Sequence, residues 1–249
     1  SMLQRHIQKI LDAFGTWDLR VASNEIFFEI QKDLQWYLKR GGTDKQLLTH
    51  YVHTWIILMT PITPHLTEEL WTAQGYNQFV SNETYPEFKP QDISEKDEIG
   101  EYLLTRVIED VNEIVKVTKM TPKKICIYTS PTWKQNIYRK ALEQSAQKTF
   151  NVGQLIKETT ADPRMKPLGQ QVSQFVAKIA PEVKMLSDTD RGRFLIAIDE
   201  KAHLSDAKPY LSEVLHCPVE IYSADDLNLY DPAKKTRFAS PLRPAIYIE

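Results

Sequence analysis

The chain has 249 residues, of which 42% are hydrophobic and 26% are charged, so it can bury a sizeable core and is long enough for two domains. No apolar run reaches about 18 residues, and no signal-like segment is present, which excludes a membrane-spanning helix and predicts a soluble, cytoplasmic protein. The net charge of −2 argues against a uniformly basic surface for nucleic acid.

A bundle of four helices is predicted for residues 1–90. Apolar residues recur at helical spacing over residues 3–14 and 21–38, and glycines follow both runs. Thr43 or Asp44 should cap a third helix that stops near Thr60, before the first of two prolines. A fourth helix should begin at Pro64 with Thr63 as its N-cap and with Glu68 near its positive end. Residues 76–93 contain two prolines among polar residues and predict a loop.

The remaining chain predicts a linker helix within residues 91–120 and a small α/β domain over residues 121–249. The fold class is therefore mainly α with a small α/β part. The apolar run 194–198 is compatible with either a strand or a helix. The predicted helices cover about 94–118, 131–149, 152–160, 163–179 and 205–215, and the strands 124–129 and 219–222.

Cysteine, histidine and acidic residues give no firm chemical motif. Cys126 and Cys217 lie far apart in short apolar runs, which favours reduced core residues over a disulfide. No cysteine or third ligand lies at a spacing from the histidines that suits zinc. We therefore expect the histidines to have packing roles and predict no metal site. The adjacent acids are more typical of helix caps than of general acid–base catalysis. The histidines and acids considered are His50, His53, His65, Glu68, Asp199, Glu200, Asp225 and Asp226.

The small net charge hides a strongly basic region. Residues 116–193 hold 15 basic and 6 acidic side chains, whereas the segments before and after are acidic. Such a surplus could neutralise several phosphates, although a solvated lysine-rich surface would give the same count. Trp133 and Tyr138 lie among these cations and suit either a nucleic-acid surface or the anchoring of a helix.

Four sequence motifs resemble parts of one enzyme family. Residues 59–71, MTPITPHLTEELW, resemble the helical bundle that follows the catalytic domain in class I aminoacyl-tRNA synthetases for leucine, isoleucine and valine. Residues 25–42, EIFFEIQKDLQWYLKRGG, resemble the preceding helix in leucyl-tRNA synthetases of the archaeal type. Residues 123–134, KKICIYTSPTWK, and 230–249, YDPAKKTRFASPLRPAIYIE, resemble the C-terminal domain and tail of those enzymes. The resemblance covers nearly the whole chain.

The resemblance implies a C-terminal portion of such a synthetase, because the chain has no HIGH-type or KMSKS-type motif and no glycine-rich phosphate loop. The opening Ser1-Met2 is typical of an expression remnant. The portion should contain no catalytic residue and no cofactor, while ATP and magnesium would act in the absent catalytic domain. The implied partners are leucine tRNA, gripped by its long variable arm, and the parent's catalytic and editing domains. A monomer is expected.

The last twenty residues distinguish the hypotheses best. Residues 234–243 contain four cations and no acid, which suits phosphate contacts, and Ile246 and Ile248 are the predicted base contacts. Alternatively, this tail adds an edge strand to its own sheet. The rival functions are a helical protein-interaction module and a hydrolase, and the latter has no sequence support. The predicted phosphate contacts are Lys123, Lys124, Lys134, Arg139, Lys140, Lys234, Lys235, Arg237 and Arg243.

Overall fold

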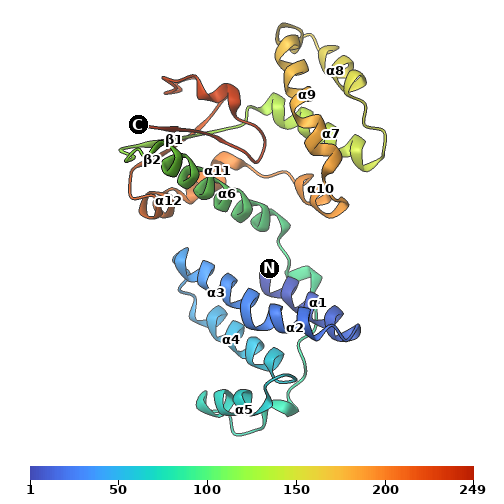
Figure 1. Ribbon diagram of the computed structural model, residues 1–249, viewed down its shortest axis with the longest axis vertical. Coiled ribbons are helices and arrows are strands. Elements are labelled where there is room, and N and C mark those ends of the chain that lie inside the picture. The colour runs from blue at the N-terminus through green and yellow to red at the C-terminus, as the bar shows by residue number, and fades with distance from the viewer. The chain divides into compact units, whose positions relative to one another are not determined.

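The computed structural model describes residues 1–249 and confirms a mainly helical fold with a small three-stranded sheet (Figure 1). The chain divides into two compact units, Ser1–Ser94 and Glu95–Glu249. The long helix that the sequence suggested as a linker lies in the second unit. None of the helices combines the length and the apolar character that crossing a membrane requires.

The first unit is a bundle of helices around one apolar core. The buried side chains of this core include Ile7, Ile26, Ile56 and Trp71, which come from all four predicted helices. The predicted helix 21–38 is one continuous run that contains a turn of π-helix. The elements are α1 (Met2–Gly15), α2 (Leu19–Asn24), the π-helical η1 (Glu25–Glu29), α3 (Ile30–Lys39), α4 (Lys45–Met59) and α5 (Pro64–Ala73).

The predicted helix caps are confirmed in part. The Asp44 carboxylate accepts hydrogen bonds from the backbone N–H groups of Gln46 (2.9 Å) and Leu47 (3.0 Å), as an N-cap should. Thr63 occupies the N-cap position of α5, but its hydroxyl donates to the carbonyl of Met59 instead (3.3 Å). Glu68 accepts from two backbone N–H groups in the following loop, so it fixes that loop. The loop contains the 3₁₀ turns η2 (Val80–Asn82) and η3 (Pro90–Asp92).

A buried ionic network ties α1 to the π-helical turn. Glu25 begins this turn and is 2% exposed. His6 lies between two carboxylates: its Nδ1 is 2.8 Å from Glu25 Oε2, and its Nε2 is 2.7 Å from Asp33 Oδ2. The ammonium of Lys9 pairs with the other oxygen of Glu25. Burial by itself lowers the pKa of His6, but the hydrogen bonds and negative charges of Asp33 and Glu25 outweigh burial and raise it.

The second unit is built around strand β1 (Ile125–Thr129), whose five residues are all buried. The sheet order is β2-β1-β3, with β2 (Val219–Ser223) parallel and β3 (Ala245–Ile248) antiparallel to β1. Helices α11 (Glu200–Asp206) and α12 (Lys208–Val214) pack on β2, and α11 also contacts α6 (Glu95–Thr118). The central strand carries Cys126, and both it and Cys217 are buried and unpaired, as expected.

The chain between β1 and β2 forms a second group of packed helices. Helices α7 (Thr132–Ala146), α8 (Val152–Thr160) and α9 (Gly169–Met185) pack together around a core of their own (Figure 1). The prediction for the third of these was wrong at both ends, because residues 166–168 form the 3₁₀ turn η4 and Pro181 is accommodated inside the helix. Helices α10 (Asp188–Phe194) and α11 were not predicted, and residues 195–198 form neither a strand nor a helix.

The C-terminal residues fold back into the second unit, which confirms the edge-strand alternative. Ile125 of β1 lies opposite Ile248, and Ile127 lies opposite Ile246. Before this strand, the 3₁₀ turn η5 (Lys235–Phe238) is anchored by the Lys134 ammonium, which donates to the carbonyls of Arg237 (2.8 Å) and Ala239 (2.6 Å). The backbone of the tail is therefore positioned by Lys134, a side chain distant in sequence.

We predict that the stability of the first unit depends on His6 and declines as the pH rises. A raised folded-state pKa stabilises the fold fully below the unfolded pKa of about 6.5, and this stability is lost as the pH rises through the folded pKa. His6→Leu should lower the free energy of unfolding by about 3 kcal/mol at pH 6, because Glu25 is left buried with a single partner, and should flatten the pH dependence. Urea unfolding followed by tryptophan fluorescence checks both effects, since four of the five tryptophans lie in this unit.

The matched control is His65→Leu, which changes an exposed histidine of α5 and should alter stability by less than about 0.5 kcal/mol. Parallel pH profiles for wild type and His6→Leu would contradict the assignment to His6.

We predict that Lys134→Met loosens the tail. Two carbonyl groups lose their donor, and each buried acceptor left without a partner costs about 1–3 kcal/mol. Deuterium exchange at residues 238–243 and tryptic cleavage after Arg237 should both accelerate. Lys140→Met, an exposed change on the same helix, should leave both rates unaltered. Unchanged rates in Lys134→Met would show that the tail does not depend on this ammonium.

Candidate nucleic-acid interface

The predicted cations occupy different environments in the second unit. Lys124 and Lys235 are half-buried, and Lys134 is buried at 6% exposure. The exposed members of the set are Lys123, Arg139, Lys140, Lys234, Arg237 and Arg243.

Two of the predicted RNA contacts, Lys134 and Ile246, are buried in the fold. The pKa of Lys134 is lowered to about 8 by burial and, secondarily, by the nearby charge of Lys178, and its ammonium is occupied by two carbonyls. Ile246 is 9% exposed within β3, and Ile248 is half-buried there. Pairing with β1 directs the Ile246 side chain into the fold, so Ile246 offers little surface for the predicted base contact.

Exposed aromatic rings instead lie just before the tail strand, in what we call the aromatic segment (residues 230–238). The Tyr230 ring is 42% exposed, and the ammonium of Lys124 lies 5.1 Å from its centroid. The Phe238 ring is 53% exposed, and the guanidinium of Arg237 lies 4.6 Å from its centroid. Each ring is thus paired with a cation, an arrangement that suits the stacking of nucleic-acid bases beside phosphates.

The aromatic segment has a defined backbone. The Asp231 carboxylate accepts from the backbone N–H groups of Lys235 (2.7 Å) and Thr236 (2.9 Å), and from the Thr236 hydroxyl (2.8 Å). Burial alone would raise the pKa of Asp231, but these donors lower it overall. The Tyr128 hydroxyl donates to the carbonyl of Tyr230 (2.7 Å), which joins the segment to the central strand. The only acid of the segment is therefore used to shape the loop.

The tail turn (residues 240–243) follows this segment. The N–H of Ser240 donates to the carbonyl of Arg243 (3.0 Å), and the N–H of Arg243 donates back to Ser240 (2.9 Å). Helix α9 contacts both ends of the turn, because Lys178 Nζ lies 3.2 Å from Ser240 Oγ and Arg243 Nη1 lies 3.9 Å from Glu182 Oε2. Leu242 has a φ of +57°, a left-handed conformation that favours glycine.

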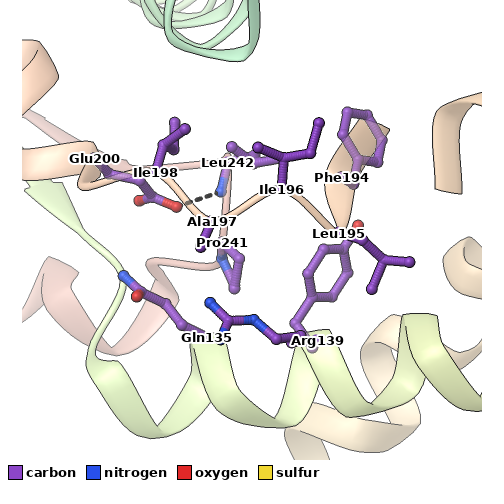
Figure 2. Close-up of a pocket in the computed structure, with 11 residues that line it drawn as sticks. Gln135, Arg139, Phe194, Leu195, Ile196, Ala197, Ile198, Glu200, Pro241 and Leu242 are labelled. Carbon is purple, nitrogen blue, oxygen red and sulfur yellow. Dashed lines mark hydrogen bonds between the residues drawn. The ribbon is translucent and has the colours of Figure 1, made fainter. Parts of the chain in front are cut away.

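A pocket lies beside the tail turn (Figure 2). The Arg139 side chain points from α7 toward the turn, as Figure 2 shows, while Gln135 Nε2 donates to the carbonyl of Ser130 (3.0 Å). Glu200 accepts a hydrogen bond from the N–H of Leu242 (2.8 Å). The lining comprises Gln135, Tyr138 and Arg139 of α7, residues 194–198, Glu200, and Pro241 and Leu242 of the turn.

For Trp133 and Tyr138, the structure favours the anchoring of a helix over a place on the surface. Trp133 packs edge-on against Phe175 of α9, and Tyr138 is buried in the helical core, so both anchor a helix. Tyr230 and Phe238 were missed, although the alternation of rings and cations in YDPAKKTRF was available as a signal. Which rings remain exposed depends on the pairing of the tail with β1, and composition alone does not predict this pairing.

Three of the other residues considered in the sequence, His53, Asp199 and Asp225, have structural roles. The His53 ring lies 4.5 Å from the Trp71 ring and 5.6 Å from the Tyr76 ring, which places it in aromatic packing. No group of three or more histidines, cysteines or acids is arranged to hold a metal ion. Asp199 caps α11 by accepting from the N–H of Ala202 (2.9 Å), and Asp225 accepts from the N–H of Thr132 (2.7 Å).

The chain is similar to known leucine–tRNA ligases over its whole length. It is 42% identical to the leucine–tRNA ligase of Methanosarcina barkeri, 41% to that of Methanosarcina acetivorans and 37% to that of Methanothrix thermoacetophila. Each alignment covers 100% of this chain, which spans only about a quarter of the relatives' length.

A family model described as the anticodon-binding domain of tRNA ligase matches residues 1–127. This match includes the whole helical bundle, together with α6 and the start of β1. The chain therefore belongs to the family of anticodon-binding domains of tRNA ligases.

Proposed function

We propose that this chain is the tRNA-binding C-terminal portion of a leucine–tRNA ligase, that its second unit grips the long variable arm of leucine tRNA, and that its helical bundle contacts the tRNA stem. The observation that carries this proposal is the aromatic segment, which presents two exposed rings paired with cations. The whole-chain similarity to leucine–tRNA ligases supports leucine as the matching tRNA.

The chemistry of the segment fits RNA that is not fully double-stranded. Exposed rings can stack on unpaired bases, whereas cations bind phosphates regardless of sequence. The bases of an A-form helix are stacked on one another and its major groove is deep and narrow, so unpaired bases in loops and at the ends of arms are the parts that such rings can stack on. We assign phosphate contacts to Lys123, Arg139, Lys140, Lys234, Arg237 and Arg243, all of which are exposed.

On this proposal the chain supplies binding, and the rest of the ligase supplies catalysis. Activation of leucine with ATP and magnesium would take place in the catalytic domain, and misacylated tRNA would be cleared by the editing domain. Leucine tRNA is the partner, and we propose that the chain acts as a monomer in the cytoplasm. A free-standing interaction module is not favoured, because the similarity to ligases extends over 100% of the chain.

We predict that Phe238→Ala weakens binding to leucine tRNA by about 5- to 150-fold, because a stacked base contributes about 1–3 kcal/mol. Shortening the variable arm should weaken wild-type binding to a similar degree and should have little further effect on Phe238→Ala. Fluorescence anisotropy at about 150 mM salt, with intact and arm-shortened leucine tRNA, measures both effects.

We predict that Arg237→Gln reduces the slope of log affinity against log salt by about 0.7–0.9, as expected for one lost phosphate contact. The matched control is Arg20→Gln, an exposed change in α2 that should leave the slope unaltered. Equal binding of intact and arm-shortened tRNA by the wild type would contradict recognition of the arm and leave only a general electrostatic grip.

A further inference from the structure

The turn between α3 and α4 carries the densest positive charge of the first unit. Residues 39–45 hold three of this unit's eight lysines and arginines, and two of the three, Lys39 and Lys45, are exposed. The unit as a whole has eleven acidic residues, so the charge of the turn is opposite in sign to that of the unit around it. A local excess of cations on an acidic unit favours an anionic partner at this turn.

The acids near this turn have other partners. Between Asp33 and Glu68 the chain contains a single acid, Asp44. Its carboxylate caps α4 by accepting from two backbone N–H groups, and it faces the positive end of that helix dipole. Asp33 is the only acid of α3, and its Oδ2 lies 2.7 Å from Nε2 of His6. The ammonium groups of the turn are therefore available to an anion from outside the unit.

The backbone of the turn is ordered before any partner binds. The N–H of Gly42 donates to the carbonyl of Tyr37 (2.9 Å) and that of Gly41 to the carbonyl of Leu38 (3.0 Å), which is the Schellman arrangement at the end of α3. Gly41 has a φ of +82°, and a Cβ on Gly42 would lie 2.3 Å from the Tyr37 ring. The Tyr37 hydroxyl accepts from the N–H of Asp44 (3.3 Å). An ordered turn lowers the entropy cost of binding.

Uncharged hydrogen-bonding side chains surround the turn on both helices. On α3, Gln31, Gln35 and Lys39 recur every four residues, so they share one face, and all three are exposed. The first two turns of α4 expose a similar set, Lys45, Gln46, Thr49 and His50.

Cations and neutral donors suit the phosphates and ribose hydroxyls of RNA. Two exposed leucines beside the turn, Leu38 and Leu47, would suit a protein partner instead. The excess of positive charge around these leucines favours RNA.

We propose that the α3–α4 turn binds the backbone of a tRNA stem, with Lys39 and Lys45 on phosphates. Gln35 and Gln46 donate to phosphate or ribose oxygens beside them. This inference rests on the proposed tRNA-binding function and names the part of the bundle that contacts the stem. Because backbone contacts carry no sequence information, the contact is independent of the base pairs of the stem.

The test measures affinity against salt concentration for the full chain by fluorescence anisotropy, with intact and with arm-shortened leucine tRNA. Lys39→Gln and Lys45→Gln should each reduce the slope of log affinity against log salt by about 0.9, as expected for one lost phosphate contact on a duplex. At about 150 mM salt each should weaken binding about fivefold. The effects should be equal for the two tRNAs, because both contain the stem. Exchanging base pairs within the stem should leave binding unaltered.

The matched control is Arg20→Gln. Helices α2, η1 and α3 form one continuous run, and Arg20 lies near its first residue, about 30 Å along the helix axis from Lys39. This exposed change should leave the slope unaltered.

Unaltered slopes in both lysine variants would overturn the inference and favour a protein partner on Leu38 and Leu47. Effects confined to the intact tRNA, or binding that depends on the base pairs of the stem, would also overturn it. Unaltered slopes in the variants, together with weaker wild-type binding of arm-shortened tRNA, would refute the stem contact and leave recognition of the arm standing. Reduced slopes without that weakening would refute recognition of the arm and leave the stem contact.

Discussion

The pairing of β3 with β1 is the constraint on which the proposed RNA-binding surface depends. This antiparallel pairing fixes the C-terminus. Hydrogen bonds from the side chains of Lys134, Asp231 and Glu200 to the backbone then position the residues that precede β3. The exposed rings and cations are consequently held on an ordered backbone. Ordering them in advance reduces the entropy that binding would otherwise cost.

Charge in this chain is used in two distinct ways, and burial separates them. Lys134 and the pair of His6 and Glu25 lie inside the fold, where their ionic hydrogen bonds join segments distant in sequence. Arg237 and Lys234 remain at the surface, where a cation can exchange its counterions for RNA phosphates. A count of basic residues therefore overstates the size of a binding surface, because some of these residues serve the fold.

Much of the architecture follows from local sequence. Apolar spacing and caps located the helices of the first unit, the long helix α6 and the strands β1 and β2. The features that the sequence did not predict depend on tertiary packing rather than on local sequence. They are the path of residues 195–198, the break between α11 and α12, and the burial of Ile246. The π-helical turn was not predicted either. Its first residue, Glu25, is buried in contact with His6 and Lys9 of another helix, which local sequence does not reveal. For the surface, the cationic composition was predictable, whereas the exposed aromatic rings depend on how the tail pairs.

Hydrogen–deuterium exchange of the chain with and without leucine tRNA tests the central claim most directly. If the ordered tail presents the RNA-binding surface, tRNA should slow exchange over residues 230–243, with the strongest protection at the backbone amides around Phe238. A tRNA with a shortened variable arm should give less protection there. Protection confined to the first unit, with residues 230–243 unchanged, would contradict the account and place the interface on the helical bundle.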